Sequence, residues 1–299
     1  MRDKYPQILG ALKSTKVSLL MLALVVFLFA VIVGSIRFKL LISAQDMAVT
    51  VKEAVELSFI GYFFNNFLPT SIGGDVVKAY YLSKNTDKKA ASYASVFVDR
   101  ALGLVTMVFM AFIALFFVKE GVVDNTVKYL VYAITLASIV AMALMTNKKL
   151  AKHFSFLLFL VRPIREKLKT LYDIIHKYRY QKSLIWKSFA ISFISQILFF
   201  ISLGVVALSV GGYIPMKDMF IKIPIISIIS LFPSINGLGL REGSTVVFFS
   251  PMLGQSRAFA VSILWLLILL GTSVIGGVIY AMSPQFKIKL KEVKEESPI

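Results

Sequence analysis

Two segments of this 299-residue sequence place proline, glycine and charged residues in the same order within apolar surroundings. The first covers residues 66–78 and the second covers residues 231–243. Proline removes a backbone hydrogen-bond donor and glycine relaxes the backbone, so both segments predict a break in a helix. Inside a membrane such a break is tolerated only where it is buried in protein or lines a cavity. Two corresponding breaks in one chain therefore predict a binding site of the kind found in transporters.

The polar and flexible residues of both breaks, with one charged pair between them, form the candidate substrate-binding set. This set is Asn66, Pro69, Gly73, Gly74, Asp75, Lys78, Asp99, Arg100, Asn236, Gly237, Gly239, Arg241 and Glu242.

Arg241 and Glu242 are the sharpest candidates because they directly follow the Gly237-Leu238-Gly239 turn. A charge near the centre of a bilayer costs about 2.5–3.5 kcal/mol on insertion scales, so it must face protein, water or a ligand. The planar guanidinium of Arg241 suits a phosphate group. Glu242 could hold that guanidinium or meet a cationic headgroup. An ion pair that only closes the turn explains the two residues equally well.

Asp99 and Arg100 form a second charged pair, close to the inner end of an apolar run. Adjacent residues on a helix point about 100° apart, so these two need not pair with each other. One can face the interior while the other reaches the interface. A role as an interfacial anchor is slightly favoured over a ligand contact.

The first break offers amide groups on Asn65 and Asn66 and charges on Asp75 and Lys78. Asp75 is predicted to cap the helix that follows, which would leave free N–H groups and a positive dipole end facing a cavity. A phosphate binds well at such an end. The alternative is that Asp75 is only a cap and that Lys78 only marks the cytoplasmic side.

The sequence holds no arrangement typical of an enzyme. Cysteine is absent, and the two histidines, His153 and His176, lie in a basic stretch away from the apolar runs. No metalloprotease, nucleophile-elbow or phosphate-loop motif occurs. We therefore expect a protein that is not an enzyme, with no catalytic residues, no metal and no cofactor.

The composition predicts a polytopic membrane protein: 58% of the residues are hydrophobic and 16% are charged, against about 25% charged in soluble proteins. Five apolar runs approach or exceed the roughly 20 residues that cross a bilayer as a helix. They cover residues 17–36, 91–118, 127–146, 183–210 and 257–282. The net charge of +17 resides mostly in the connecting loops, where it sets orientation and attracts anionic lipids. We expect no nucleic-acid partner.

The distribution of Lys and Arg predicts the orientation of the chain. Residues 147–187 hold eleven Lys and Arg against two acids, which indicates a cytoplasmic loop. Its interleaved apolar residues favour helices lying on the inner surface, although a solvated basic linker explains them almost as well. The tail over residues 284–299 is also charged and is predicted to be cytoplasmic.

Counting spans outward from that loop places the two breaks on opposite sides. The pieces over residues 219–232 and 244–253 are each too short for a comfortable span, so they predict a re-entrant hairpin from the outer face. Residues 57–72 would dip from the inner face. We therefore expect an all-α polytopic membrane protein forming one domain over residues 1–299, with about six to eight membrane helices including broken or re-entrant segments. An inverted repeat is the accompanying hypothesis.

The motifs also follow one another in a fixed order along the chain. The order is Arg37-Phe38, Asn65, Pro69, Gly73-Gly74-Asp75, Lys78, Asp99-Arg100, Gly103-Leu104, Pro233, Gly237-Leu238-Gly239 and Arg241-Glu242. It resembles the flippase-like integral membrane domain of lysylphosphatidylglycerol synthetases, which also occurs in stand-alone membrane proteins and attached to some archaeal glycosyltransferases. The likeness covers almost the whole chain.

Two departures from that family limit what the resemblance implies. Family members usually begin with one more membrane helix, and no soluble transferase domain follows residues 294–296 here. The resemblance therefore does not imply lipid aminoacylation. It implies only the translocation activity of the family, which moves a polar-headed lipid between leaflets.

We predict a lipid flippase or transporter of the cell's inner (cytoplasmic) membrane that moves a polar-headed phospholipid or glycolipid between leaflets. Its partners would be membrane lipids with an anionic or aminoacylated headgroup. One alternative is a scaffold for a separate glycosyltransferase or synthase, which would dock on residues 147–187. A less favoured alternative is a membrane enzyme acting on a lipid-linked substrate, with Glu242 or Asp99 as acid or base.

Overall fold

The computed structural model describes residues 5–66, 68, 73–86, 88–117, 125–146, 173–230 and 237–283, and these ranges contain helices and no strand. This confirms the predicted all-α class. By length and composition, four helices could cross a membrane: α2 (Val17–Ser43), α5 (Lys89–Phe116), α9 (Lys182–Ser209) and α12 (Gln255–Met282). The chain is therefore a multi-pass membrane protein.

The remaining helices are shorter or less apolar. They are α1 (Tyr5–Lys13), α3 (Val51–Asn65), α4 (Gly73–Thr86), α6 (Asn125–Thr146), the 3-10 turn η3 (Tyr178–Tyr180), α10 (Met216–Ile229) and α11 (Leu240–Leu253). The apolar part of α6 extends over Asn125–Val140.

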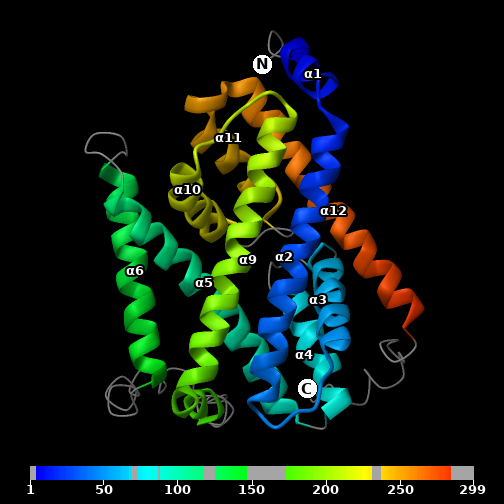
Figure 1. Cartoon of the computed structure of the whole chain (residues 1–299), viewed down its shortest axis with the longest axis vertical. Coiled ribbons are helices and arrows are strands. Elements are labelled where there is room, and N and C mark those ends of the chain that lie inside the picture. Colours follow the sequence, from blue (N-terminus) through cyan, green and yellow to red (C-terminus); the bar gives the residue numbers. More distant parts are fainter. Residues whose placement is uncertain are drawn as a thin grey trace.

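The helices fall into two groups with the same order, a long helix, two short ones and another long one. α2, α3, α4 and α5 have 27, 15, 14 and 28 residues. α9, α10, α11 and α12 have 28, 14, 14 and 28 residues. In Figure 1, α2 runs downward and α9 upward, the α3–α4 hairpin fills the lower half, and the α10–α11 hairpin fills the upper half. This arrangement agrees with the expected inverted repeat.

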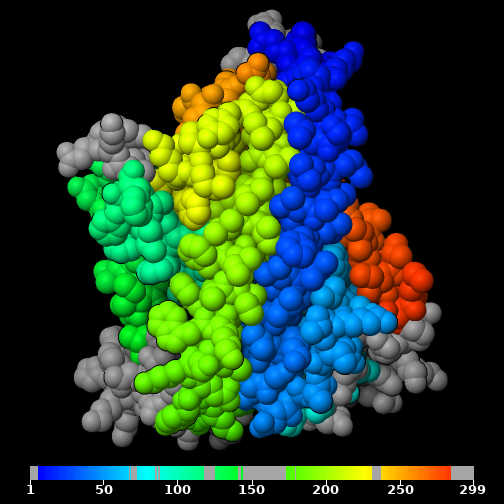
Figure 2. Space-filling model, viewed as in Figure 1, coloured from blue at the N-terminus to red at the C-terminus, as the bar shows by residue number. Residues whose placement is uncertain are grey.

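α2 and α9 pack extensively against each other and lie antiparallel, side by side along one face of the molecule (Figure 2). Hydroxyl groups of α9 bond directly to the backbone of α2: Ser195 Oγ donates to the Ala30 carbonyl oxygen at 3.0 Å, and Ser202 Oγ to that of Ala23 at 2.7 Å. Small residues at the contact let the two backbones approach closely.

Close backbone contacts position α3. A Cβ added to Gly74 of α4 would lie 1.9 Å from the Gly61 carbonyl oxygen of α3, and one added to Gly276 of α12 would lie 2.0 Å from that of Phe59. Only glycine permits these approaches. At its start α3 is fixed by a capping box, in which Thr50 and Glu53 bond each other's backbone N–H groups.

One predicted boundary is wrong. The first apolar run was expected to end at residue 36, but α2 continues through Arg37 to Ser43. The helix can contain this charge because Arg37 pairs with a carboxylate of α5. The predicted basic loop over residues 147–187 is described only from residue 173, and the predicted tail over residues 284–299 lies outside the described residues.

Candidate functional site

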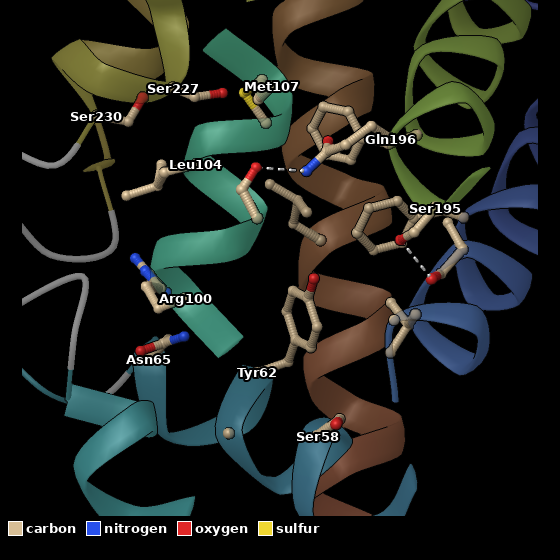
Figure 3. Close-up of a pocket in the computed structure, with 18 of the residues that line it drawn as sticks. Ser58, Tyr62, Asn65, Arg100, Leu104, Met107, Ser195, Gln196, Ser227 and Ser230 are labelled. Atoms are coloured by element: carbon tan, nitrogen blue, oxygen red, sulfur yellow. Dashed lines mark hydrogen bonds between the residues drawn. The ribbon is translucent and has the colours of Figure 1, made fainter. Parts of the chain in front are cut away.

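A cavity of about 350 Å³ lies among the long helices, where the inner ends of both hairpins meet α2, α5, α9 and α12 (Figure 3). Part of its wall is apolar and includes Phe27, Phe199, Leu203, Trp265 and Leu269. The rest is polar and includes Arg37, Ser58, Tyr62, Asn65, Asn66, Asp75, Lys78, Asp99, Arg100, Ser195, Gln196, Ser227, Ser230, Arg241 and Thr245.

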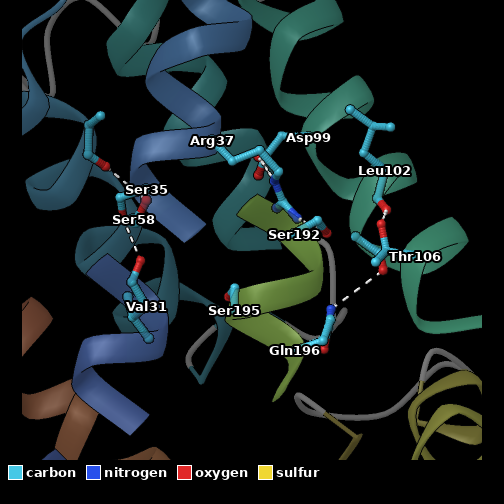
Figure 4. A network of polar contacts seen from close by, with 12 residues as sticks. Val31, Ser35, Arg37, Ser58, Asp99, Leu102, Thr106, Ser192, Ser195 and Gln196 are labelled. Carbon is cyan, nitrogen blue, oxygen red and sulfur yellow. Dashed lines mark hydrogen bonds and ion pairs between the residues drawn. The ribbon is translucent and has the colours of Figure 1, made fainter. Parts of the chain in front are cut away.

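The most buried charges on this wall centre on Asp99 of α5 (Figure 4). Arg37 Nε of α2 donates to Asp99 Oδ1 at 2.8 Å, and Arg37 Nη1 donates to Ser192 Oγ at 2.8 Å. Lys78 Nζ of α4 lies 3.8 Å from Asp99 Oδ2. Arg37, Lys78 and Asp99 are 9%, 7% and 8% exposed. One carboxylate thus joins α2, α4 and α5 inside the molecule.

A second ion pair joins the α3–α4 hairpin to α5. Arg100 Nη1 donates to Asp75 Oδ2 at 2.8 Å. Asp75 lies in the first turn of α4, which begins at Gly73. The Gly74 N–H donates instead to Asn65 Oδ1 at 2.8 Å. The prediction that Asp75 precedes and caps this helix is therefore wrong: the helix begins two residues before Asp75, and the carboxylate of Asp75 accepts from the guanidinium of Arg100.

Two glycines make room for the cationic side chains. A Cβ on Gly61 would lie 2.8 Å from Lys78 Cδ, and a Cβ on Gly103 would lie 3.3 Å from Arg37 Nη1. The Lys78 stem therefore crosses α3 at a residue without a side chain, and the Arg37 guanidinium passes α5 in the same way. Lys78 Nζ also lies 4.0 Å above the centroid of the Phe38 ring, a cation–π contact.

At the start of α11, Arg241 and Glu242 form the ion pair that was considered from the sequence. Glu242 Oε1 accepts from Arg241 Nε at 2.9 Å and from Nη2 at 2.7 Å, while Glu242 Oε2 accepts from the Gly239 N–H at 2.7 Å. Gly237 and Gly239 have φ values of +75° and +86°, which favour glycine. Glu242 thus caps the helix and holds Arg241, and Arg241 lines the cavity.

The cavity brings together about half of the predicted residues, from both breaks and the pair between them. Those on its wall are Asn66, Asp75, Lys78, Asp99, Arg100 and Arg241. Gly73, Gly74, Gly237, Gly239 and Glu242 shape the adjoining helix starts. Pro69 and Asn236 lie outside the described residues.

The structure also differs from the favoured interpretation of the Asp99–Arg100 pair. These residues were interpreted as an interfacial anchor, but both line the cavity and each bonds to a residue of another helix. Asp99 and Arg100 contact different partners, which agrees with the expected angle of about 100° between neighbouring residues on a helix.

Sequence reasoning left Arg37 out of the candidate set, although it noted the residue within the ordered motifs. The signal was that apolar residues continue after Arg37, at Phe38 and, beyond Lys39, at residues 40–42, which is typical of a helix that continues. For Ser195, Gln196 and Tyr62 there was no such signal, because single polar residues are common in apolar helices.

Comparison with known proteins gives the same family as the ordered sequence motifs. The family described as "Lysylphosphatidylglycerol synthase TM region" matches residues 6–277. A UPF0104 membrane protein of Methanothermobacter thermautotrophicus is 25% identical over 271 residues, which cover 82% of this chain and 77% of that protein.

Two further archaeal UPF0104 membrane proteins match more locally. That of Pyrococcus horikoshii is 27% identical over 153 residues (49% of this chain), and that of Methanocaldococcus jannaschii is 32% identical over 130 residues (43% of this chain). These alignments span 45% and 38% of the two relatives' lengths. No solved structure matches. Since the family match covers most of the sequence, the chain belongs to the lysylphosphatidylglycerol synthase transmembrane-region family.

Proposed function

We propose that this protein moves a polar-headed lipid, a phospholipid or a glycolipid, between the leaflets of the cell's inner membrane. The observation that carries this proposal is a cavity lined by four cationic side chains and two carboxylates within a bundle of apolar helices. A headgroup that crosses hydrocarbon needs replacements for its hydrogen bonds to water. Side chains of this wall supply them, while the acyl chains stay in the bilayer.

The two hairpins support the same function. Helices of 14 or 15 residues are roughly 21–23 Å long at 1.5 Å per residue, too short to cross a hydrocarbon core of about 30 Å. We propose that α3–α4 enters the membrane from the cytoplasmic face and α10–α11 from the opposite face. Broken helices that meet at one central site from both sides suit a transporter in which each face opens in turn.

The test is lipid movement in vesicles reconstituted with the full chain. Vesicles would carry a trace of fluorescent phosphatidylglycerol, phosphatidylcholine or a glycolipid, and an impermeant reductant would report the fraction in the outer leaflet over time. We expect faster exchange than in protein-free vesicles for at least one lipid, and loss of the difference in Arg241→Ala, which removes a cavity-lining guanidinium.

Arg257→Ala is the matched control, because Arg257 is exposed in the first turn of α12 and does not line the cavity. Its vesicles should behave as wild type. Exchange no faster than in empty vesicles for all three lipids, with and without an imposed ion gradient, would refute the proposed function. Equal rates in wild type and Arg241→Ala would remove Arg241 from the mechanism.

A further inference from the structure

The charges around the cavity do not balance. Among the described residues, four cations line it: Arg37, Lys78, Arg100 and Arg241. Asp75 and Asp99 also line it, and the carboxylate of Glu242 holds Arg241 from beside the wall. Four cations against three carboxylates leave one positive charge in excess. A buried uncompensated charge is unfavourable, so it favours an anionic occupant.

The excess resides mainly on Lys78. Each of the three guanidinium groups has a carboxylate oxygen at 2.7 or 2.8 Å: Arg37 with Asp99, Arg100 with Asp75, and Arg241 with Glu242. The ammonium group of Lys78 lies 3.8 Å from Asp99, the carboxylate that Arg37 already engages.

Lys78 is also built to reach an occupant. Its stem crosses α3 at Gly61, where any larger residue would obstruct it. A lysine ammonium is compact, with three donors on a flexible stem, so it can turn from a distant carboxylate to a nearer anion. The residue is 7% exposed, and its surroundings therefore screen such a contact far less than water would.

We propose that the cavity selects a phosphate group with one net negative charge, and that Lys78 is the side chain that binds it. This proposal rests on the proposed function, since it takes the cavity as the headgroup site. A phosphodiester headgroup with no amine neutralises the excess charge and gains a charge-assisted hydrogen bond. A zwitterionic headgroup brings no net charge, and an aminoacylated one adds a cation to a site that is already positive.

The test measures binding by the purified full chain in detergent, separately from lipid movement. The probes are dihexanoyl phosphatidylglycerol, dihexanoyl phosphatidylcholine and dimethyl phosphate, with thermophoresis giving each Kd. We expect the phosphatidylglycerol to bind at least about tenfold more tightly than the phosphatidylcholine, the range expected for a hydrogen bond to a charged group. Lys78→Met should abolish this preference, and Lys78→Arg should retain it.

Lys84→Met is the control, since Lys84 is exposed on the same helix, with its ammonium group 5.2 Å from the centroid of the Tyr80 ring. The preference should survive this change. Binding can be located with Trp265, which lines the cavity. The chain has two tryptophans, and the other one, Trp186, has a side chain that is 71% exposed. Trp186→Phe therefore leaves Trp265 as the sole fluorescent tryptophan. Its emission should change when the phosphatidylglycerol binds.

Each outcome has a defined meaning. Equal affinity of the wild type for the two lipids overturns the proposal whether or not any variant folds, and so does an unchanged preference in folded Lys78→Met. Binding of dimethyl phosphate but not of either lipid supports the phosphate site and contradicts a lipid substrate. Selective binding without lipid movement supports the phosphate site at Lys78 and refutes lipid transport. Lipid movement without selective binding supports lipid transport and refutes the phosphate site.

Discussion

At the residue scale, Asp99 compensates two buried cations with one carboxylate. It accepts a hydrogen bond from Arg37 and lies 3.8 Å from Lys78. Removing one member of a buried charge pair is more damaging than replacing the whole pair by apolar residues, because the remaining charge is left without compensation. Asp99 is therefore the position in this cluster where the smallest chemical change should have the largest effect.

We expect Asp99→Asn to lower the free energy of unfolding by about 3 kcal/mol, because Arg37 and Lys78 both lose their carboxylate. Thermal unfolding in detergent measures the change as a lower Tm. Asp46→Asn is the control: Asp46 is exposed with φ of +55°, a conformation that asparagine tolerates, so its effect should stay within about 0.5 kcal/mol. Equal Tm values for the two variants would contradict the role of Asp99.

The identities of the charged cavity residues were largely predictable, and their partners were not. Lys78, Asp99, Arg100 and Arg241 stand out because charges are rare in apolar sequence. The pairing of Asp99 with Arg37 spans 62 positions and depends on how α2 packs against α5. No local pattern contains that information.

At the element scale, α3 is held between two helices by direct backbone contact. Gly74 brings α4 against it at Gly61, and Gly276 brings α12 against it at Phe59. Dense packing leaves little freedom to absorb an extra methyl group at such a point. The position of this hairpin, and with it the lower wall of the cavity, therefore depends on single glycines.

Gly276→Ala should destabilise the protein by about 1–3 kcal/mol, the usual effect of overpacking, because its Cβ would lie 2.0 Å from the Phe59 carbonyl oxygen. Gly271→Ala, in the same helix, meets nothing closer than Leu24 Cδ1 at 4.0 Å. It should be neutral or stabilising by up to about 1 kcal/mol, since alanine favours helix more than glycine does. Thermal unfolding of the two variants side by side measures this, and a Gly276→Ala protein as stable as wild type would refute the close contact.

Most helix boundaries followed from hydrophobicity, within two residues for α5, α6, α9 and α12. The end of α2 did not, because Arg37 and Lys39 interrupt the apolar run while the helix continues seven residues past residue 36. A compensated charge does not end a helix, and compensation is a tertiary property. The close contacts of Gly74 and Gly276 with α3 could not be predicted either. In the sequence alone, a glycine that permits close helix packing cannot be distinguished from one that allows a turn.

At the scale of the whole molecule, the repeated order of helices explains why two distant breaks contribute to one cavity. α4 and α11 begin at Gly73 and Leu240 and run in opposite directions in Figure 1. Loop charges alone predicted that the two breaks approach from opposite sides. They could not predict the cavity, because its wall also needs the packing of α2 against α9.

The absence of cysteine makes this arrangement directly testable against a membrane. Ser14→Cys would place a thiol between α1 and α2, while Ala90→Cys and Ser183→Cys would place thiols at the starts of α5 and α9, and all three positions are exposed. The start of α2 lies at the opposite end of the molecule from the other two sites. An impermeant maleimide added to spheroplasts should label Ser14→Cys at once, and the other two only after permeabilisation. Residues 147–187, which lead into α9, hold eleven Lys and Arg and favour the cytoplasm for that end of the molecule, and they outnumber Lys13 and Lys16 beside Ser14. Labelling of Ser14→Cys and Ala90→Cys from the same side would contradict both the orientation and the proposal that the hairpins enter from opposite faces.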